Sequence, residues 1–342
     1  MGRSGMERRL EPASRRYREA IEGAAAFIES HQLSSGAIPC TQDGVTDPWD
    51  LVECAIALDL CGRSEQAAKA YRWLRQRQNP DGSWHYAYLG DQPQDRAKDS
   101  NHSAYVATGV WRHYLATGND GFLTEMWPTV EGGVQFSLGL QQLAGEVYWA
   151  RDAGGDPWPG ALLTGSSCIW QSVSHGIAIA DKLGYDREHW RAANARLERA
   201  IRERPWLFDR HGENARGYAM NWYYPVLCGV LPADEASRRL GAAWDEFVVE
   251  GWGCKCSLDQ PWVTVAETCE LALALTAVGQ PDKAATLVDW VLQLADGDGG
   301  FWTGINVEQQ VVYPPGEKTT WTAAAAVMAM VALAGQPRPG GP

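Results

Sequence analysis

Apolar residues in this chain follow two helical patterns that alternate from the N-terminus to the C-terminus. In the first pattern, seen at 15–31, apolar residues recur every three or four positions among charged ones, which is typical of a helix with one buried face. In the second, seen at 50–62 and 320–334, small and apolar residues occupy almost every position, and Lys and Arg are nearly absent. A helix of this kind is buried on all sides. The alternation predicts an outer layer and an inner layer of helices.

The two patterns combine into a unit that recurs about six times. Each unit has an outer helix, a loop rich in Gly, Trp and acidic residues, an inner helix that ends at a glycine, and a short turn. The capping glycines are spaced about 45 to 65 residues apart, which indicates stacked helical hairpins. The predicted outer helices are 15–31, 65–78, 119–141, 187–203, 233–248 and 283–295, and the predicted inner helices are 50–62, 100–117, a helix ending at Gly184, 220–231, 262–278 and 320–334.

Six such hairpins can close into a ring, in which the long loops all emerge at one end. We therefore expect an all-α fold, the (α/α)6 toroid, as a single domain over 15–336. Residues 1–14 and 337–342 are expected to be a disordered lead and tail. The alternative is an open solenoid of the same hairpins.

Charge and composition exclude several classes of protein. The net charge of -12 argues against nucleic acid or an anionic membrane as the main partner. No apolar run follows the basic N-terminus, and the longest one, 323–334, is too short to span a bilayer, so we expect a cytoplasmic protein. The 8 cysteines lack C-x-x-C pairs. We expect reduced thiols, no metal and no cofactor, and we leave the oligomeric state open.

The chain is rich in tryptophan, with 17 Trp residues, and this feature of its composition says most about a possible ligand. Many lie in the Gly-rich or acidic loops, beside carboxylates and amides. Aromatic rings with polar neighbours suit a sugar, whose C–H faces stack on rings while its hydroxyls form hydrogen bonds. The same rings would suit an isoprenoid chain or its carbocation. Composition leaves both small-molecule substrates open.

Two families with this barrel resemble the chain. The segment 78–84, QNPDGSW, is similar to the QW repeat of squalene cyclases and prenyltransferases, with weaker copies at 32–36 and 296–302. In that family the motif ties neighbouring hairpins together and does not contact substrate. The acidic D-x-D-D cluster of the cyclases is missing, and the zinc ligands of the prenyltransferases are not recognisable.

The second resemblance, to the glucoamylase family of six-hairpin glycosidases, covers about 35–335. That family has a Trp and an Asp at the start of an early inner helix, which Trp49 and Asp50 resemble. The segments 99–105 and 118–128, DSNHSAY and GNDGFLTEMWP, are similar to its next hairpin. The segment 145–184 looks like the part that carries the family's catalytic acid.

The chain departs from that family where its catalytic carboxylates are expected. Trp149 is followed by Ala150 rather than Glu, and Thr303 stands where the general base is expected. Asp152 is the nearest acid to the first position, although Arg151 beside it would hold it ionised or make it a salt-bridged loop residue. Glu308 is the best local candidate for the second carboxyl.

Other candidates lie on inner helices. Glu267 and Glu53 are carboxylates among small residues, so each must either line the site or be salt-bridged. Asp50 could bind sugar hydroxyls or only cap a helix, and His102 and His175 could be acid–base groups or satisfied core residues. The predicted catalytic residues are Asp152, Glu308 and Glu267. The predicted substrate-binding residues are Trp49, Asp50, Glu53, His102, Tyr105, Trp149, Arg151, Trp170, His175, Asn221, Tyr223, Trp262, Trp302 and Trp321.

These features predict a carbohydrate-active enzyme of the six-hairpin glycosidase type, with non-standard catalytic carboxylates and a sugar or glycoside as substrate. An isoprenoid-processing enzyme and a non-catalytic sugar-binding toroid are the alternatives. Two opposed carboxyls across the pit would favour hydrolysis.

Overall fold

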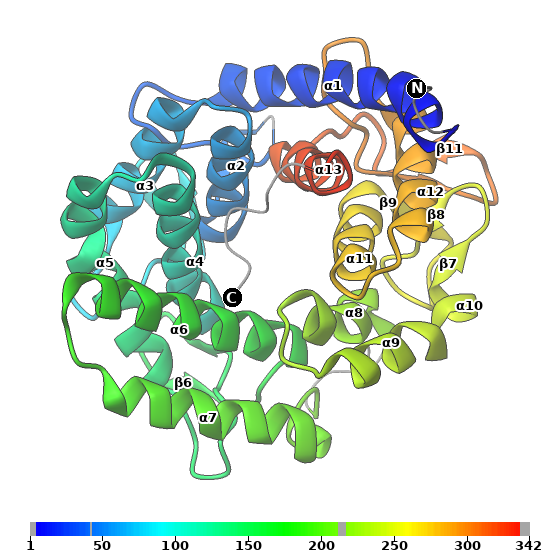
Figure 1. Cartoon of the computed structure of the whole chain (residues 1–342). Helices are drawn as coiled ribbons and strands as arrows, with labels where there is room; N and C mark the ends of the chain where they lie inside the picture. Colours follow the sequence, from blue (N-terminus) through cyan, green and yellow to red (C-terminus); the bar gives the residue numbers. More distant parts are fainter. Residues whose placement is uncertain (1–4, 42, 211–216, 336–342) are drawn as a thin grey trace.

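The computed structural model describes residues 5–41, 43–210 and 217–335, with side chains from Arg16 onward. Its helices alternate between an outer and an inner layer around one axis (Figure 1). The outer helices are α1 (Gly5–His31), α3 (Ser64–Arg77), α5 (Asp120–Leu138), α7 (Glu188–Glu203), α9 (Ala233–Ala242) with the short α10 (Trp244–Phe247), and α12 (Pro281–Val291). The inner helices are α2 (Pro48–Leu60), α4 (Ser100–Thr117), α6 (Leu163–Leu183), α8 (Ala219–Leu227), α11 (Val265–Ala277) and α13 (Thr320–Leu333). The 3-10 turns η1 (Pro205–Leu207) and η3 (Leu292–Leu294) follow α7 and α12.

The inner helices close into a complete ring. Each one packs against the next in chain order, and α13 packs against α2. Burial follows the sequence pattern, since α13 is buried over most of its length, whereas α7 buries only one side, at residues such as Trp190 and Leu197. The structure is therefore the predicted (α/α)6 toroid and not an open solenoid.

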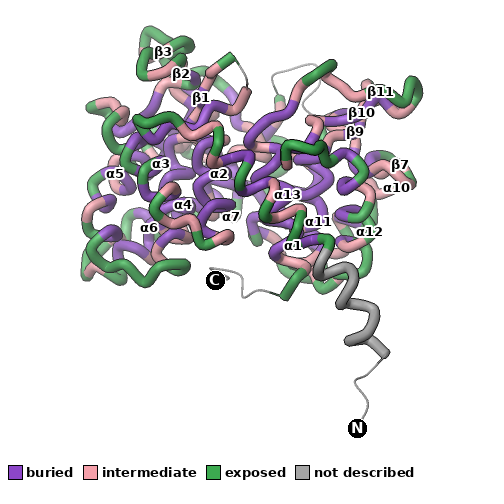
Figure 2. The backbone as a smooth tube through the Cα atoms, turned by 90° about the horizontal axis from the view of Figure 1, so that it is seen from above, coloured by how far each residue is buried: buried purple, intermediate pink, exposed green. Residues whose placement is uncertain are grey.

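Short antiparallel strands occupy the long loops, which the sequence predicted only as irregular segments. The strands are β1 (Val45–Thr46), β2 (Ala87–Leu89), β3 (Gln92–Asp95), β4 (Lys98–Asp99), β5 (Ala150–Arg151), β6 (Pro157–Trp158), β7 (Val248–Val249), β8 (Gly253–Cys254), β9 (Trp262–Thr264), β10 (Gly304–Asn306) and β11 (Val311–Val312). They form sheets in the orders β1-β2-β3, β4-β5-β6, β11-β10-β9 and β7-β8. Figure 2 shows β1–β3 and β9–β11 at one end of the toroid. We call the strand-bearing end the mouth.

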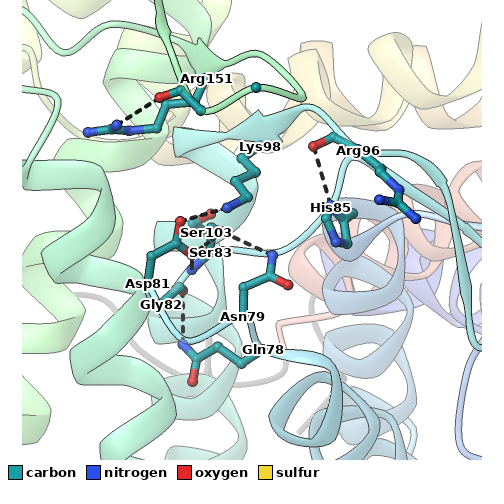
Figure 3. Close-up of polar contacts among 12 residues, drawn as sticks. Gln78, Asn79, Asp81, Gly82, Ser83, His85, Arg96, Lys98, Ser103 and Arg151 are labelled. Carbon is teal, nitrogen blue, oxygen red and sulfur yellow. Dashed lines mark hydrogen bonds and ion pairs between the residues drawn. The ribbon is translucent and has the colours of Figure 1, made fainter.

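The QW-like segment holds neighbouring hairpins together, as its resemblance implies (Figure 3). The Gln78 side-chain amide donates to the carbonyl of Gly82 at 2.9 Å and to that of Thr129, on α5, at 2.9 Å. Trp84 Nε1 donates to the carbonyl of Leu74 at 2.8 Å. Gln32, at the first weaker copy, makes the same kind of pair with Gly36 and with Gln66 on α3. The motif is accounted for by the fold and carries no information on the substrate.

Several predicted boundaries differ from the structure. α1 begins at Gly5 rather than near Arg15, so only residues 1–4 of the predicted disordered lead, like the tail 337–342, lie outside the described residues. The first residues of the predicted inner helix at 262–278 are strand β9, because they pair with β10. The predicted outer helix 233–248 is interrupted at Ala243.

Other sequence expectations are met within the described part of the chain. Gly118 and Gly184 end α4 and α6 in the left-handed conformation, with φ of 65° and 81°. All 8 cysteines are free thiols. Among the helices described, none is both long enough and apolar enough to cross a bilayer.

Candidate active site

The start of α2 places two carboxyl groups side by side at the mouth. Asp47 precedes Pro48 and is therefore biased away from helical geometry, and its side chain caps α2 by accepting from the Asp50 backbone N–H at 2.9 Å. Asp50 is thus not the cap, and its carboxyl is free to face Asp47. Burial and the negative charges of Asp47 and Glu53 raise the pKa of Asp50 well above its usual range. This environment favours the protonated form of Asp50.

Cys40 completes this cluster. Its Sγ and the carboxylate oxygens of Asp47 and Asp50 lie within 4.8 Å of one another, a spacing that a metal ion could use. However, burial raises the pKa of the Cys40 thiol, and its sulfur donates to the Val45 carbonyl at 3.1 Å. In the described structure the thiol therefore acts as a hydrogen-bond donor beside the two carboxyls.

A second layer of carboxyls lies one helical turn deeper. Glu53 accepts a short hydrogen bond from the Tyr105 hydroxyl, and its other oxygen is buried with no partner in the described structure. Glu270, on α11, accepts from both Tyr223 and Tyr224. Burial raises the pKa of both carboxyls, even though these hydrogen bonds lower it. Neither has a salt-bridge partner, so the lumen-lining alternative describes Glu53.

Glu267 stands at the start of α11, one turn above Glu270. It is 5% exposed and accepts a short hydrogen bond from the Thr264 hydroxyl at the end of β9. Its negative charge raises the pKa of Glu270 and of Cys256, which places it beside both. Asp50 and Glu53 on α2 therefore have counterparts in Glu267 and Glu270 on α11, with the same spacing of three residues.

Aromatic rings separate and frame these carboxyls. The Trp49 ring stacks on Tyr105 with centroids 4.3 Å apart and lies 6.1 Å from the Tyr224 ring. Tyr86 stacks on His102 at 5.0 Å. These rings form a plate beneath Asp50, on which the C–H face of a sugar could stack.

Two further stacked pairs lie on the small sheets of the mouth. Trp149, directly before β5, stacks on Trp158 of β6 at 4.8 Å, and Trp158 is 45% exposed. Trp262 of β9 stacks on Tyr313 at 4.3 Å. Together with the plate, these two sheets provide several separate aromatic surfaces, an arrangement suited to an extended chain of sugars.

Two of the three predicted catalytic residues lie in hairpin turns. Asp152 Oδ1 accepts from the backbone N–H groups of Gly154 and Asp156 in the β5–β6 turn. Arg151 does not pair with it but donates to the Gly155 carbonyl at 2.9 Å (Figure 3). Glu308 lies in the β10–β11 turn, where its N–H donates to the Asn306 side chain. Their catalytic roles stay predictions, and the structure gives both positions a turn-forming environment.

The remaining predicted residues are dispersed. Asn221 accepts from Thr164, and the Lys318 ammonium, which pairs with Asp296 and Asp298, lies 4.9 Å from the Trp302 ring centroid. Trp321 Nε1 is buried without a partner among the described residues. Trp170 and His175 line a cavity at the opposite end of the lumen. Tyr223 contacts Glu270, and the sequence reasoning missed Glu270 although its i+3 spacing from Glu267 repeats that of Asp50 and Glu53.

Comparison with known proteins now decides between the two resemblances. The chain is 42% identical over 315 residues to MMP endo-(1,4)-3-O-methyl-alpha-D-mannosidase of Mycolicibacterium hassiacum, a match that covers 92% of this chain and 86% of the relative. The chain belongs to the family of this glycosidase. No family model matches it.

Solved structures agree on the fold. A glycosidase in complex with glucose superposes with a TM-score of 0.75 at 15% identity, over 97% of this chain and 99% of that one. A D-mannose isomerase does so with a TM-score of 0.72 at 12% identity, over 92% and 96%. Of the two families that the sequence resembles, the glycosidase one is therefore confirmed, with a six-hairpin toroid that also serves sugar isomerisation.

Proposed function

We propose that this protein is an endo-acting glycoside hydrolase that cleaves α-mannosidic bonds in a methylated mannan. The observation that carries the proposal is that two carboxyl groups, Asp50 and Glu267, stand in the first turns of two inner helices, at the mouth. The similarity to the mannosidase supports the substrate class. The several aromatic pairs support a polymeric substrate rather than a single sugar.

In the proposed reaction, Asp50 is the proton donor. Its carboxyl O–H transfers the proton to the glycosidic oxygen as the bond from that oxygen to the anomeric carbon breaks. The raised pKa keeps the proton on Asp50 until it is needed, and Asp47 accepts a hydrogen bond from the Asp50 backbone N–H. Arg151 and Asp152, by contrast, contribute to the shape of the mouth.

Glu267 is the proposed base. It takes a proton from the water that attacks the anomeric carbon, so that the sugar gains a hydroxyl and the leaving chain gains the proton of Asp50. Thr264 orients the carboxylate through its hydroxyl. The Trp49–Tyr105 plate holds the sugar face.

The test is hydrolysis of a 3-O-methylated mannan oligosaccharide, with products followed by mass spectrometry and the anomer first formed by NMR. Asp50→Asn and Glu267→Gln should each lower kcat by about 10²- to 10⁴-fold, the usual contribution of a general acid or base. Glu198→Gln, on the outer helix α7, is the matched control and should retain activity.

Two outcomes would contradict this assignment. Wild-type levels of activity in Asp50→Asn, with a loss in Asp152→Asn or Glu308→Gln, would return catalysis to the hairpin turns. Binding of the oligosaccharide without any product would instead indicate a non-catalytic sugar-binding toroid.

A further inference from the structure

One chamber of the toroid extends away from the Asp47, Asp50 and Glu267 carboxyls at the mouth. It has a volume of about 530 Å³ and extends to the final turns of the inner helices, where Leu60, Ala277 and Ala332 line it. Trp49, Asp50, His102 and Glu267 do not line it. We call this space the rear chamber.

A tyrosine partition lies between Trp49 and the rear chamber. Tyr105 and Tyr224 line the chamber, and Tyr105 also stacks on Trp49, which does not line it. The Tyr105 hydroxyl donates a hydrogen bond to Glu53, and the Tyr224 hydroxyl donates one to Glu270. A ligand in the rear chamber would therefore occupy a different place from a sugar stacked on the mouth side of Trp49.

The two walls of the rear chamber differ in chemistry. The wall from α4 and α6 carries Arg112, Gln171, Ser174 and His175. The facing wall, from α8, α11 and α13, is mainly aliphatic and includes Leu227, Leu273 and Val331. The carboxyls of Glu53 and Glu270 also line the chamber. With a size in the usual range of ligand pockets, about 300 to 1,000 Å³, such a chamber suits a small molecule with one polar end and one apolar end.

Arg112 indicates that the polar end of the ligand carries a negative charge. Among the described residues its guanidinium has no hydrogen bond or ion pair, and its Nε is buried without a partner. His175 cannot share the positive charge, because burial and Arg112 lower its pKa to about 3. Glu53 and Glu270 accept hydrogen bonds from tyrosine hydroxyls, and burial raises the pKa of each, which favours their neutral forms. The charge of Arg112 lowers the pKa of Glu53, but no hydrogen bond or ion pair joins the two side chains in the described structure.

We propose that the rear chamber binds a small organic anion with an aliphatic body, a short-chain carboxylate, at a site distinct from the catalytic mouth. The carboxylate accepts a two-pronged hydrogen bond from the Arg112 guanidinium, which is the strongest pairing that this side chain makes. The chain lies on the aliphatic wall, where its burial is favourable. A neutral sugar would leave the guanidinium without a hydrogen-bonded anion, and a bare inorganic anion would leave the aliphatic wall unused.

Isothermal titration calorimetry tests this proposal with three compounds that carry the carboxylate, the alkyl chain or both. Hexanoate has both the charge and the chain, acetate has only the charge, and 1-hexanol has only the chain. Hexanoate should bind one per protein and about ten- to hundredfold more tightly than either of the others, the usual contribution of a charged hydrogen bond. Equal affinity for hexanoate and 1-hexanol would overturn the proposal.

Two variants locate the binding. Arg112→Gln should lower hexanoate affinity by the same ten- to hundredfold factor and leave 1-hexanol affinity unchanged. Ala277→Phe, which fills the chamber from α11, should abolish binding of both and keeps the test decisive if Arg112→Gln fails to fold. Arg238→Gln, at an exposed arginine of α9, is the control and should bind hexanoate as the wild type does.

Competition distinguishes the rear chamber from the mouth. A methylated mannan oligosaccharide at saturation should leave hexanoate affinity within about twofold, since the two sites are separated by the partition. Full displacement of hexanoate by the oligosaccharide, or unchanged hexanoate binding in both chamber variants, would place the anion elsewhere and refute the inference.

Discussion

Replacing Asp47 with Asn isolates the electrostatic control of the proposed proton donor. Asn caps a helix as well as Asp does, so the start of α2 is retained. The change removes one negative charge beside Asp50 and leaves the Asp50 carboxyl in place. Asp47 thus acts through Asp50, and the variant asks whether its charge sets the pH range of activity.

The size of the effect follows from the geometry. The carboxylate oxygens of Asp47 and Asp50 lie within 4.8 Å of each other. Two unit charges at that separation interact by about 3.5 kcal/mol at an effective dielectric constant near 20. Each tenfold change in proton affinity is about 1.4 kcal/mol, so removing the charge should move the basic limb of the kcat/KM profile by about 2.5 pH units.

The direction of the pH shift follows from the proposed role of Asp50 as a general acid. Its raised pKa keeps it protonated to higher pH, and activity is lost as the pH rises through that pKa. Without the Asp47 charge the pKa falls, so the basic limb should shift to lower pH. Asp99→Asn is the matched control, because Asp99 caps the neighbouring inner helix α4 in the same way and is not a cause of the Asp50 shift.

The same substitution should stabilise the folded protein, although it narrows the pH range of activity. A carboxyl whose pKa is higher in the folded than in the unfolded state costs stability as the pH rises above its unfolded value. Asp47→Asn relieves part of that cost and should raise Tm at pH 7 by roughly 3 °C. An unmoved basic limb with an unchanged Tm would refute the coupling of the two carboxyls.

Three more predictions concern the mouth and the frame. Trp158→Ala should raise KM for a methylated mannan by about tenfold with kcat unchanged, because it removes an exposed stacking ring; an equal effect on a short aryl glycoside would contradict this. Gly82→Ala should lower the free energy of unfolding by about 3 kcal/mol or more, since φ is +87° and a Cβ would lie 2.2 Å from the Gly132 carbonyl oxygen. Gly118→Ala, with φ +65° and nothing within 4 Å, should lower the free energy of unfolding by only about 1 kcal/mol. Urea titration of both variants measures these losses, and equal losses would argue against the predicted clash at Gly82. His113→Ala should cost about 3 to 5 kcal/mol, because it leaves the Asp59 carboxyl buried without the imidazole that contacts both its oxygens at 2.9 and 3.0 Å. A double variant with Asp59→Ala should lose less than the sum of the single losses, and strict additivity would count against the pairing.

The sequence by itself determined the architecture of this protein. Periodicity separates helices with one apolar face from helices that are apolar all round, and that difference is local, so it can be read without a structure. Gly118 and Gly184 marked helix ends for the same reason. The resemblance to six-hairpin glycosidases was sound because it rested on a run of motifs in a fixed order.

Only the tertiary structure decided which carboxyls share a site. Asp152 and Glu308 stand beside motif residues in the sequence, yet hairpin pairing carries both into turns. The sequence showed Asp47 at the start of a helix, but its contact with Asp50 depends on the orientation of both side chains. Glu270 and Arg112 gained their significance from helices far apart in the chain, because closing the ring brings α4, α6 and α11 around one lumen. Proximity through space is set by packing, and spacing along the chain does not encode it.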